Sequence, residues 1–493
     1  MATASSRFEA VIGLEIHAHL LTASKIFCGC STSFGAPPNT HVCPVCLGFP
    51  GALPVLNGRA VDLAIRAALA LGCRINPTSI FARKNYFYPD LPKGYQISQY
   101  EQPLASAGLM AFATAEGIAR VGITRVHLEE DAGKSLHEGF PDSDRKTYVD
   151  YNRSGTPLIE IVTEPDLRSA SSAAEFFTRL RAILVWLGVN DGNMEEGSLR
   201  CDANVSVRPS GAAALGTKVE VKNLNSFRFL QKALEYEINR QIDLLEGDGR
   251  VVQETRLWDP GVAVTMSMRS KEEAHDYRYF PEPDLPPVVV DAPRVEAIRR
   301  DMPELPEVRR QRLIAAYKLS EYDAAQMTQS LAVSDFFEAA VRAGAPAKAV
   351  SNWITGELAR ALKESGRDID ASPVSPERLA GLLTLIEKGA ISGAMAKSVF
   401  EKMLATGQAA ADIVRAEGLA QIEDESQIVQ LATEVLAKNA DAVAQYRAGK
   451  TATFGFLVGQ VMKAAGGKAN PKRVNDVLTR MLAEREGQEG RER

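Results

Sequence analysis

Polar and apolar residues alternate with a period of two in several segments of the first 295 residues. In VIGLEIHAHL, residues 11–20, the polar positions are Glu15, His17 and His19, and apolar residues fill the positions between them. Successive side chains of a strand point to opposite faces, so this pattern is typical of a half-buried strand. We therefore predict a strand here, with one glutamate and two histidines on its polar face.

Three further segments repeat the alternation, at residues 125–129, 200–208 and 218–222. Their polar positions are Arg125, His127, Glu129, Arg200, Asp202, Asn204, Ser206, Arg208, Lys218, Glu220 and Lys222. A sheet with one solvated face would show such a pattern without any function. These stripes, however, combine His, Asp, Asn and Arg, which favours an open sheet whose polar face is a working cleft.

The character of the chain changes near residue 281. The proline-dense PEPDLPPVVVDAP after Phe280 is typical of the end of a domain and a stiff connection. From about residue 296 the pattern becomes helical, with helix starts at Ser375-Pro376 and at Ser320, which has Asp323 three residues on.

Acidic DESQ near residue 424 opens a final helical module. Its last helix is predicted to begin at Asn470-Pro471 and to bury one apolar face, formed by Val474, Val477, Leu478, Met481 and Leu482. The chain is therefore expected to be an α+β protein with three parts: residues 1–295, 296–410 and 411–493.

Composition adds little about function but excludes some classes. The 493 residues are 45% hydrophobic and 24% charged, which is ordinary for a soluble globular protein. A net charge of -5 argues against a generally basic nucleic-acid coat, although nine basic against five acidic residues from Gly449 onward hint at an RNA-facing tail. No signal-peptide pattern begins the chain, and no apolar stretch is long enough to span a bilayer. We expect a cytoplasmic, unanchored protein.

Four of the six cysteines lie within residues 28–46. Cys28 and Cys30 are separated from Cys43 and Cys46 by a loop rich in Gly, Pro, Ser and Thr. Two close thiolate pairs on such a loop suit tetrahedral Zn²⁺, and four sulfur ligands indicate a structural site; reduced, unligated cysteines are the alternative. Cys73 and Cys201 fall at apolar positions and are expected in the core.

The stretch HLEEDAGKSLHE, residues 127–138, contains Gly133-Lys134-Ser135, the kind of tripeptide with which a phosphate-binding loop ends. Leu128 stands where that loop needs its first glycine, so the phosphate-loop interpretation fails. What remains is the carboxylate run Glu129, Glu130 and Asp131, which could also be a solvated acidic turn. The aromatic and basic segment 83–103 could clamp a nucleotide or stack an RNA end, and packing over a sheet edge explains it equally well.

Long motifs in order resemble the GatB family, which forms one of the chains of bacterial aspartyl/glutamyl-tRNA amidotransferases. They include GLEIHAHL, HVCPVCLGFPGALPVLN, RKNYFYPDLPKGYQISQY, HLEEDAGK, PLIEIVTEPD, MEEGSLRCDANVSVRP, VKNLNSF and FGFLVGQVMKAAGGKANP, and the resemblance runs from about residue 9 to 482. One departure is His19, where the family usually has Gln. The resemblance implies a mostly antiparallel cradle similar to glutamine synthetase, a helical domain, and a tail similar to YqeY proteins that binds tRNA.

The resemblance also implies a reaction. The side-chain carboxylate of Glu-tRNA(Gln) or Asp-tRNA(Asn) is phosphorylated by ATP and then amidated by ammonia. An amidase A subunit supplies this ammonia, and both chains are braced by a small C subunit. Phosphoryl transfer requires Mg²⁺, which prefers oxygen ligands. The implied catalytic residues are Glu15, His17, Glu129, Glu130 and Glu220; Glu15, His17 and Glu130 would hold magnesium, and Lys84, Arg200 and Asn204 would bind the nucleotide.

Two other functions stay open at this point. A noncatalytic tRNA-binding scaffold needs the basic tail and the zinc loop but not the His/Glu stripe. A zinc hydrolase acting on aminoacyl-tRNA needs an open metal position, which four cysteines do not offer.

Overall fold

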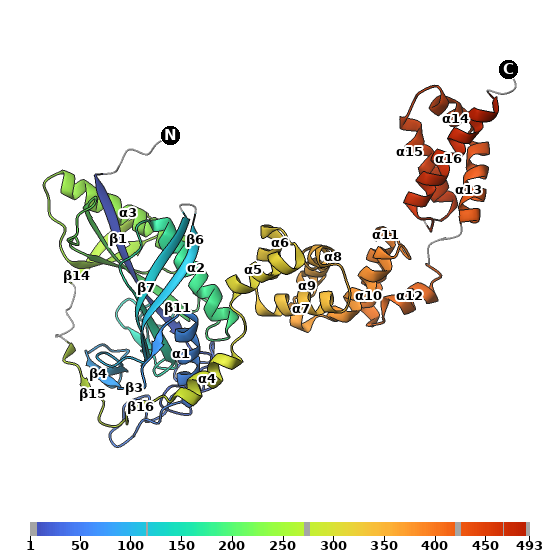
Figure 1. The fold of residues 1–493 in the computed structure, drawn as a ribbon. Helices are drawn as coiled ribbons and strands as arrows, with labels where there is room; N and C mark the ends of the chain where they lie inside the picture. Colours follow the sequence, from blue (N-terminus) through green and yellow to red (C-terminus); the bar gives the residue numbers. More distant parts are fainter. Residues whose placement is uncertain (1–6, 115–116, 271–276, 420–424, 467, 490–493) are drawn as a thin grey trace. The chain divides into compact units, whose positions relative to one another are not determined.

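The computed structural model describes residues 7–114, 117–270, 277–419, 425–466 and 468–489 (Figure 1). Backbone contacts divide the chain into two compact units, residues 1–306 and 307–493. The first unit is built around a large sheet, and the second is helical. The predicted α+β class is confirmed.

Within the described residues, nine strands form the main sheet of the first unit. In pairing order they are β14 (Val264–Ser270), β13 (Glu254–Asp259), β12 (Val219–Lys222), β11 (Leu199–Pro209), β1 (Phe8–His19), β10 (Pro157–Thr163), β7 (Gly117–Glu130), β6 (Ala105–Thr114) and β2 (Arg74–Ile75). Among these, β12 and β13 pair in parallel, and the other neighbours are antiparallel. The four strands predicted from alternation are β1, β7, β11 and β12, and the mostly antiparallel sheet is confirmed.

Strand β1 lies near the middle of the sheet, between β10 and β11. His17 is paired with Glu160 of β10 on one side and with Arg200 of β11 on the other. Glu160 is paired in turn with His127 of β7. Side chains at paired positions point to the same face of an antiparallel sheet, so these four polar residues share one face.

Helices pack against the apolar side of the sheet. They are α1 (Gly58–Ala70), α2 (Ala170–Trp186) and α3 (Phe227–Glu246). The side chains of Ile12 and Ile16, which alternate with the polar positions of β1, are 0% exposed. Ser169 begins α2 with a capping box, and Ser226 caps α3 by accepting a hydrogen bond from the backbone amide of Phe229. These helices cover the apolar side, so the polar residues of β1 point away from them.

Short strands complete the first unit. A three-stranded sheet joins β15 (Phe280–Pro281), β4 (Ala82–Asn85) and β5 (Tyr95–Ser98), and two-stranded pairs join β16 (Val288–Val289) with β3 (Thr78–Ser79) and β8 (Lys134–Leu136) with β9 (Tyr148–Asp150). The predicted boundary at residue 295 lies inside α4 (Ala292–Asp301). Helix α4 packs on α1, where Arg294 pairs with Asp62 at 2.7 Å.

The second unit begins with helices that share one apolar core. They are α5 (Pro306–Tyr317), α6 (Glu321–Met327), α7 (Leu331–Arg342), α8 (Ala347–Trp353), the π-helical turn η2 (Ile354–Leu358), α9 (Ala359–Ser365), the 3₁₀ turn η3 (Ile369–Ala371), α10 (Pro376–Glu387), α11 (Gly393–Thr406) and α12 (Ala410–Ala416). The predicted helix starts are confirmed, since Ser320 and Ser375 cap α6 and α10 with their hydroxyls. The boundary drawn at residue 410 falls within α12, whose Ile413 and Val414 belong to this core.

Four helices form a separate core at the C-terminal end of the chain. They are α13 (Glu425–Lys438), α14 (Ala440–Arg447), α15 (Ala452–Ala464) and α16 (Pro471–Glu489). Asn470 accepts hydrogen bonds from the amides of Lys472 and Arg473, so the predicted start of α16 is confirmed. The start of the DESQ segment lies outside the described residues, and α13 begins at its glutamate. Across the described residues, we find no helix long and apolar enough to cross a membrane.

Candidate functional site

Two histidines and two glutamates meet on the polar face of the main sheet. His17 Nε2 lies 3.7 Å from Glu129 Oε1 and 3.5 Å from Glu160 Oε2. His127 Nε2 lies 3.6 Å from Glu129 Oε2 and 3.4 Å from Glu160 Oε2. The donor atoms of His17, Glu129 and Glu160 lie within 4.8 Å of one another, a spacing that could hold a metal ion. We call the four residues the His/Glu cluster.

Burial and opposite charge both act on the His/Glu cluster. Burial lowers the pKa of His127, but the charges of Glu160 and Glu129 outweigh it and raise that pKa to about 9. The pKa of His17 is also raised, because the hydrogen bond and charge of Glu160 overcome its burial. Burial raises the pKa of Glu160, but the charges and hydrogen bonds of His127 and His17 outweigh it and hold that pKa well below the usual range. At neutral pH His127 is therefore protonated, and its charge faces Glu160 and Glu129.

Asp131 organises a second set of charges at the end of β1. Its Oδ2 lies 2.6 Å from His19 Nε2, 2.9 Å from the Arg200 guanidinium and 3.4 Å from that of Arg153. Although burial raises the pKa of Asp131, the charges of Arg200 and Arg153 and the His19 contact hold it well below its usual range. Asp131 therefore fixes the Arg200 side chain beside the His/Glu cluster.

Glu15 belongs to a third group, farther along the same face. Its carboxylate accepts a hydrogen bond from Asn204 Nδ2 at 2.8 Å. Lys222 Nζ lies 2.7 Å from Asp202 and 3.5 Å from Glu220, whose other oxygen accepts from Thr255. Glu15 is paired with Asp202 in the register of β1 and β11. These residues of four adjacent strands carry carboxylates, an amide, a hydroxyl and one ammonium group.

Glu130 has different surroundings from those of Glu129. Its Oε1 accepts a hydrogen bond from the Ile97 amide at 2.8 Å and pairs with Lys93. Glu130, Lys93 and Cys46 line a cavity of about 50 Å³ beside the cysteine loop. The predicted magnesium ligands Glu15, His17 and Glu130 therefore lie in three different groups of side chains.

Aromatic residues flank the polar face. Lys84 Nζ lies 4.7 Å from the centre of the Tyr277 ring, and Tyr100 stacks on Tyr279 with 4.3 Å between ring centres. Phe87 is 85% exposed. Segment 83–103 thus packs several of its rings at the sheet edge and leaves one in solvent, so both sequence-based interpretations of it stay open.

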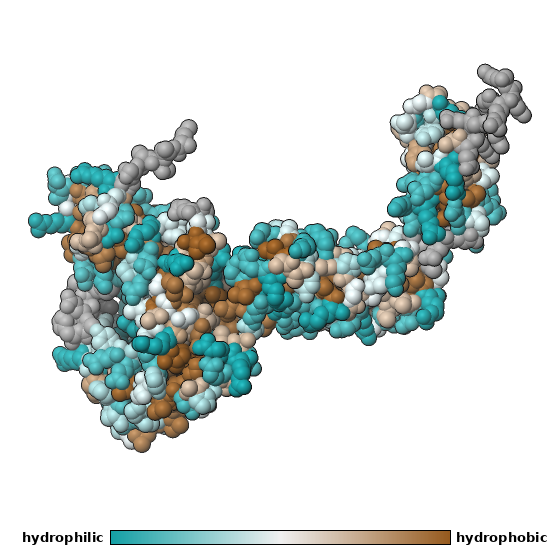
Figure 2. Space-filling model, in the orientation of Figure 1, coloured by the Kyte–Doolittle hydropathy of each residue, from teal (hydrophilic) through white to brown (hydrophobic). Residues whose placement is uncertain are grey.

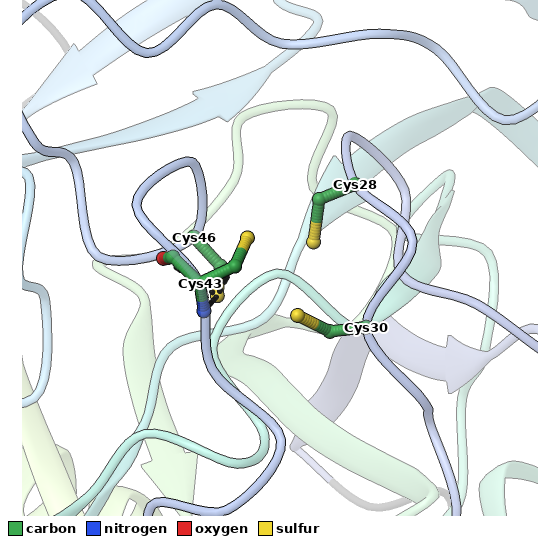
Figure 3. A group of neighbouring side chains, drawn as sticks. All are labelled: Cys28, Cys30, Cys43 and Cys46. Carbon is green, nitrogen blue, oxygen red and sulfur yellow. Dashed lines mark hydrogen bonds between the residues drawn. The ribbon is translucent and has the colours of Figure 1, made fainter.

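The four clustered cysteines converge from two loops (Figure 3). The sulfur atoms of Cys28, Cys30, Cys43 and Cys46 lie within 4.8 Å of one another. Four sulfur donors at this spacing fit a tetrahedral metal ion, so the cluster could hold one. Cys73 and Cys201 are both buried, so their predicted place in the core is confirmed.

Lys25 supports the cysteine cluster from inside the protein. Its side chain is 0% exposed, and Nζ donates to the carbonyl of His41 at 2.7 Å, to that of Tyr151 at 3.3 Å and to Cys46 Sγ at 3.6 Å. The Cys43 amide also donates to Cys46 Sγ. Positive charge and N–H donors of this kind stabilise a thiolate ligand.

Comparison with known proteins extends over almost the whole chain. Residues 10–296 match the GatB/GatE catalytic domain, and residues 335–482 match the GatB domain. A Thermodesulfovibrio yellowstonii protein, named as the B chain of the aspartyl/glutamyl-tRNA(Asn/Gln) amidotransferase, is 56% identical over 97% of this chain and 100% of its own length. The chain belongs to the GatB/GatE family. Proteins of the same name from Geotalea daltonii and Myxococcus xanthus are 56% and 53% identical, over 96% and 97% of this chain and 99% of their own lengths.

The GatB/GatE catalytic-domain match contains every polar residue described above. Sequence reasoning had not selected Glu160, Asp131, Arg153 or Lys222 as site residues. Glu160 carries a weak signal, because it is the single charged residue in the strand segment PLIEIVT. Arg153 carries none, since it lies in a loop that only the fold brings to Asp131.

Proposed function

We propose that the chain phosphorylates the side-chain carboxylate of Glu-tRNA(Gln) or Asp-tRNA(Asn) with ATP and amidates the acyl phosphate with ammonia. The observation that carries this proposal is the convergence of His17, Glu129 and Glu160 on one sheet face. The names of the relatives supply the substrate class. A carboxylate is unreactive toward ammonia because oxide is a very poor leaving group. Phosphorylation makes that oxygen part of a phosphate group, which ammonia can displace.

The His/Glu cluster is the proposed magnesium site. Two carboxylates suit a hard cation, and His17 supplies a third donor at matching distance. Bound Mg²⁺ would neutralise charge on the transferring phosphoryl group. Glu15, two residues before His17 on β1, and Glu220, two strands away on β12, are proposed as further oxygen donors on the same face. Glu130 is paired with Lys93, and we propose that it holds that lysine in the cavity beside the cysteine loop rather than ligating metal.

Cations around the cluster are proposed to bind the nucleotide. Arg200 lies beside His17 in the register and is oriented by Asp131, so its remaining N–H groups can meet developing negative charge. Lys84 at the aromatic edge and Asn204 beside Glu15 complete the set named from the sequence. Their role is to orient ATP in line with the carboxylate that attacks it.

The cysteine cluster is proposed to bind one structural zinc ion. It stands apart from the His/Glu cluster, and four protein sulfurs leave no position for a reacting water. A hydrolase that uses this zinc is therefore disfavoured. Lys25 would hold Cys46 as a thiolate and connect the loop to residues 151–155 through Tyr151.

Ammonia is proposed to come from an amidase A subunit, with a small C subunit in the same assembly. The relatives are named as one lettered chain of an amidotransferase, which supports a complex of several chains. The first unit exposes large apolar residues, among them Phe49, Leu53 and Val55, and Figure 2 shows a hydrophobic area over the region of α1. Exposed apolar surface of this kind is typical of an interface between chains.

The C-terminal module α13–α16 is proposed to bind the body of the tRNA. It has its own core, and the segment from Gly449 onward has an excess of basic residues. The alternative, that it only caps the helical part, predicts effects on stability alone. A wholly noncatalytic scaffold would not require the His/Glu cluster.

Single-turnover chemistry tests the proposal. The assembled complex, ATP and Glu-tRNA(Gln) are mixed without glutamine, and acyl phosphate is trapped as hydroxamate. Glu160→Gln should lower its formation at least ~100-fold, while the glutaminase activity of the A subunit stays. Formation at the wild-type rate would overturn the assignment of the cluster.

A further inference from the structure

A cavity of about 240 Å³ opens at the end of β1, next to the His/Glu cluster. His19, Lys134, Arg153 and Glu196 contribute to its wall, together with Phe34 from the cysteine loop. It is larger than the cavity beside the cysteines. No step of the proposed phosphoryl transfer uses it.

Lys134 presents an ammonium group to this cavity. Within the described residues its ammonium group makes no hydrogen bond or close ion pair, and its Nζ lies 4.9 Å from the centre of the Phe34 ring. The charges of Arg153, Asp150, Asp131 and Glu196 act on it from farther away. Lys134 lies on β8 opposite Asp150, in the segment that only resembles a phosphate-binding loop. An ammonium group that is half-buried and donates no hydrogen bond is a suitable partner for an anionic group of a ligand.

Glu196 offers the opposite charge on the same wall. Its carboxylate has no hydrogen bond or ion pair in the part of the chain that the structure describes. Phe34 is 63% exposed at the mouth and presents a ring on which a base can stack. Among the described residues, the cavity therefore offers an ammonium group and a carboxylate that each lack a hydrogen-bond partner, together with an aromatic surface.

An aminoacylated RNA end matches these three features. Its terminal nucleotide has a phosphate group and a base, and the esterified amino acid has an α-ammonium group. His19 and His17 are two residues apart on β1, so the cavity wall lies roughly 7 Å from the cluster. The side chain of a glutamyl or aspartyl group can span most of that distance.

We propose that this cavity receives the aminoacylated 3′-terminal nucleotide, with Lys134 on its phosphate and Glu196 on the α-ammonium group. The inference rests on the proposed function, because it assumes an aminoacyl-tRNA substrate. It assigns two specificity residues outside the His/Glu cluster. The side-chain carboxylate is directed toward His17 and Glu129, where phosphorylation is proposed.

The test uses small, non-hydrolysable probes with the assembled complex. The first is 3′-deoxy-3′-(L-glutamylamido)adenosine 5′-monophosphate. A second probe lacks the α-amino group, and a third lacks the 5′-phosphate. Dissociation constants are measured by calorimetry for the wild type and for Glu196→Gln and Lys134→Met. Glu195→Gln, next in sequence and exposed, and Lys146→Met, paired with Asp142 outside the cavity, are the matched controls.

Each variant should lose affinity only for the group that it contacts. We expect Glu196→Gln to weaken the first probe about tenfold or more and the probe without the α-amino group less than about twofold. Lys134→Met should weaken the first probe about tenfold or more and the probe without the 5′-phosphate less than about twofold. Lys134→Arg should restore most of the affinity for the first probe. The two controls should match the wild type.

Three results would overturn the inference: equal losses for all three probes, no binding of the first probe to a wild-type complex that amidates Glu-tRNA(Gln), or weaker ATP binding by Lys134→Met with unchanged probe affinity. The last result would assign the cavity to ATP. Failure of the proposed function is seen separately, as a wild-type complex that forms no acyl phosphate from ATP and intact Glu-tRNA(Gln).

Discussion

Glu129 and Glu130 are consecutive in the chain, yet their carboxylates have different partners. Glu129 lies between His17 and His127, whereas Glu130 accepts a hydrogen bond from Ile97 and pairs with Lys93. The strand alternation of β7 separates them, because adjacent side chains point to opposite faces. The two glutamates should therefore differ in their effect on metal binding.

Substitution of these neighbours by glutamine should separate metal binding from support of Lys93. We expect Glu129→Gln to weaken Mn²⁺ binding, used as a probe for Mg²⁺, about tenfold or more, because one oxygen ligand loses its charge. Glu130→Gln should leave Mn²⁺ affinity within about twofold. Electron paramagnetic resonance titration of free Mn²⁺ measures both. Equal weakening would restore Glu130 to the magnesium site named from the sequence.

The cysteine loop should contain one zinc ion per chain. Elemental analysis of reductively purified protein is expected to find this zinc, and Cys46→Ser should lose it, because a thiolate ligand is removed. Cys201→Ala, which removes a thiol buried outside the cluster, is the control and should retain the metal. A folded wild-type chain without zinc would refute the assignment.

Truncation after residue 419 should weaken tRNA binding selectively. This position keeps Ile413 and Val414 in the helical core, whereas a cut at residue 411 would remove them. We expect a higher KM for Glu-tRNA(Gln) and a smaller salt dependence of binding, since fewer phosphates are contacted. Filter binding across salt concentrations measures this. Unchanged affinity and salt slope, in a complex with unchanged glutamine hydrolysis, would show that the tail only caps its neighbours.

Acid should weaken the contact between α5 and α7 through Glu338. Hydrogen bonds from Arg312 outweigh its burial and, with those from Arg309, lower the pKa of Glu338 below its usual value of 4.5. A lowered folded-state pKa contributes stability that is present above about pH 4.5 and is lost as the pH falls through the folded-state value. Hydrogen exchange of α5 and α7 amides between pH 7 and pH 3 should show this loss.

Glu338→Gln should remove most of that pH dependence. At pH 7 it should cost about 2 kcal/mol of local stability, because Arg309 and Arg312 lose a charged hydrogen-bond acceptor while Arg309 keeps its ion pair with Asp335. Glu401→Gln on the exposed side of α11 serves as a control. An unaltered acid transition in Glu338→Gln would assign the transition to other groups.

The sequence by itself determined the local elements. Alternation located β1, β7, β11 and β12, and residue pairs such as Ser375-Pro376 located helix starts, because strand faces and helix caps depend on residues close in the chain. Cysteine spacing likewise located the sulfur cluster, and long motifs identified the family. Alternation also put Glu15, His17 and Glu129 at polar-face positions, whereas Glu130, named with Glu15 and His17 for magnesium, points to the other face.

Only the tertiary structure decided which polar residues meet. Glu160 reaches His17 because β10 pairs with β1 in one register, and a shift of one residue would turn its carboxylate to the apolar side. Arg153 reaches Asp131 from a loop, and Lys134 and Glu196 border one cavity from segments about sixty residues apart in the chain. Local patterns assign a face to each strand, but the order and register of strands depend on packing between distant segments, which no local pattern records.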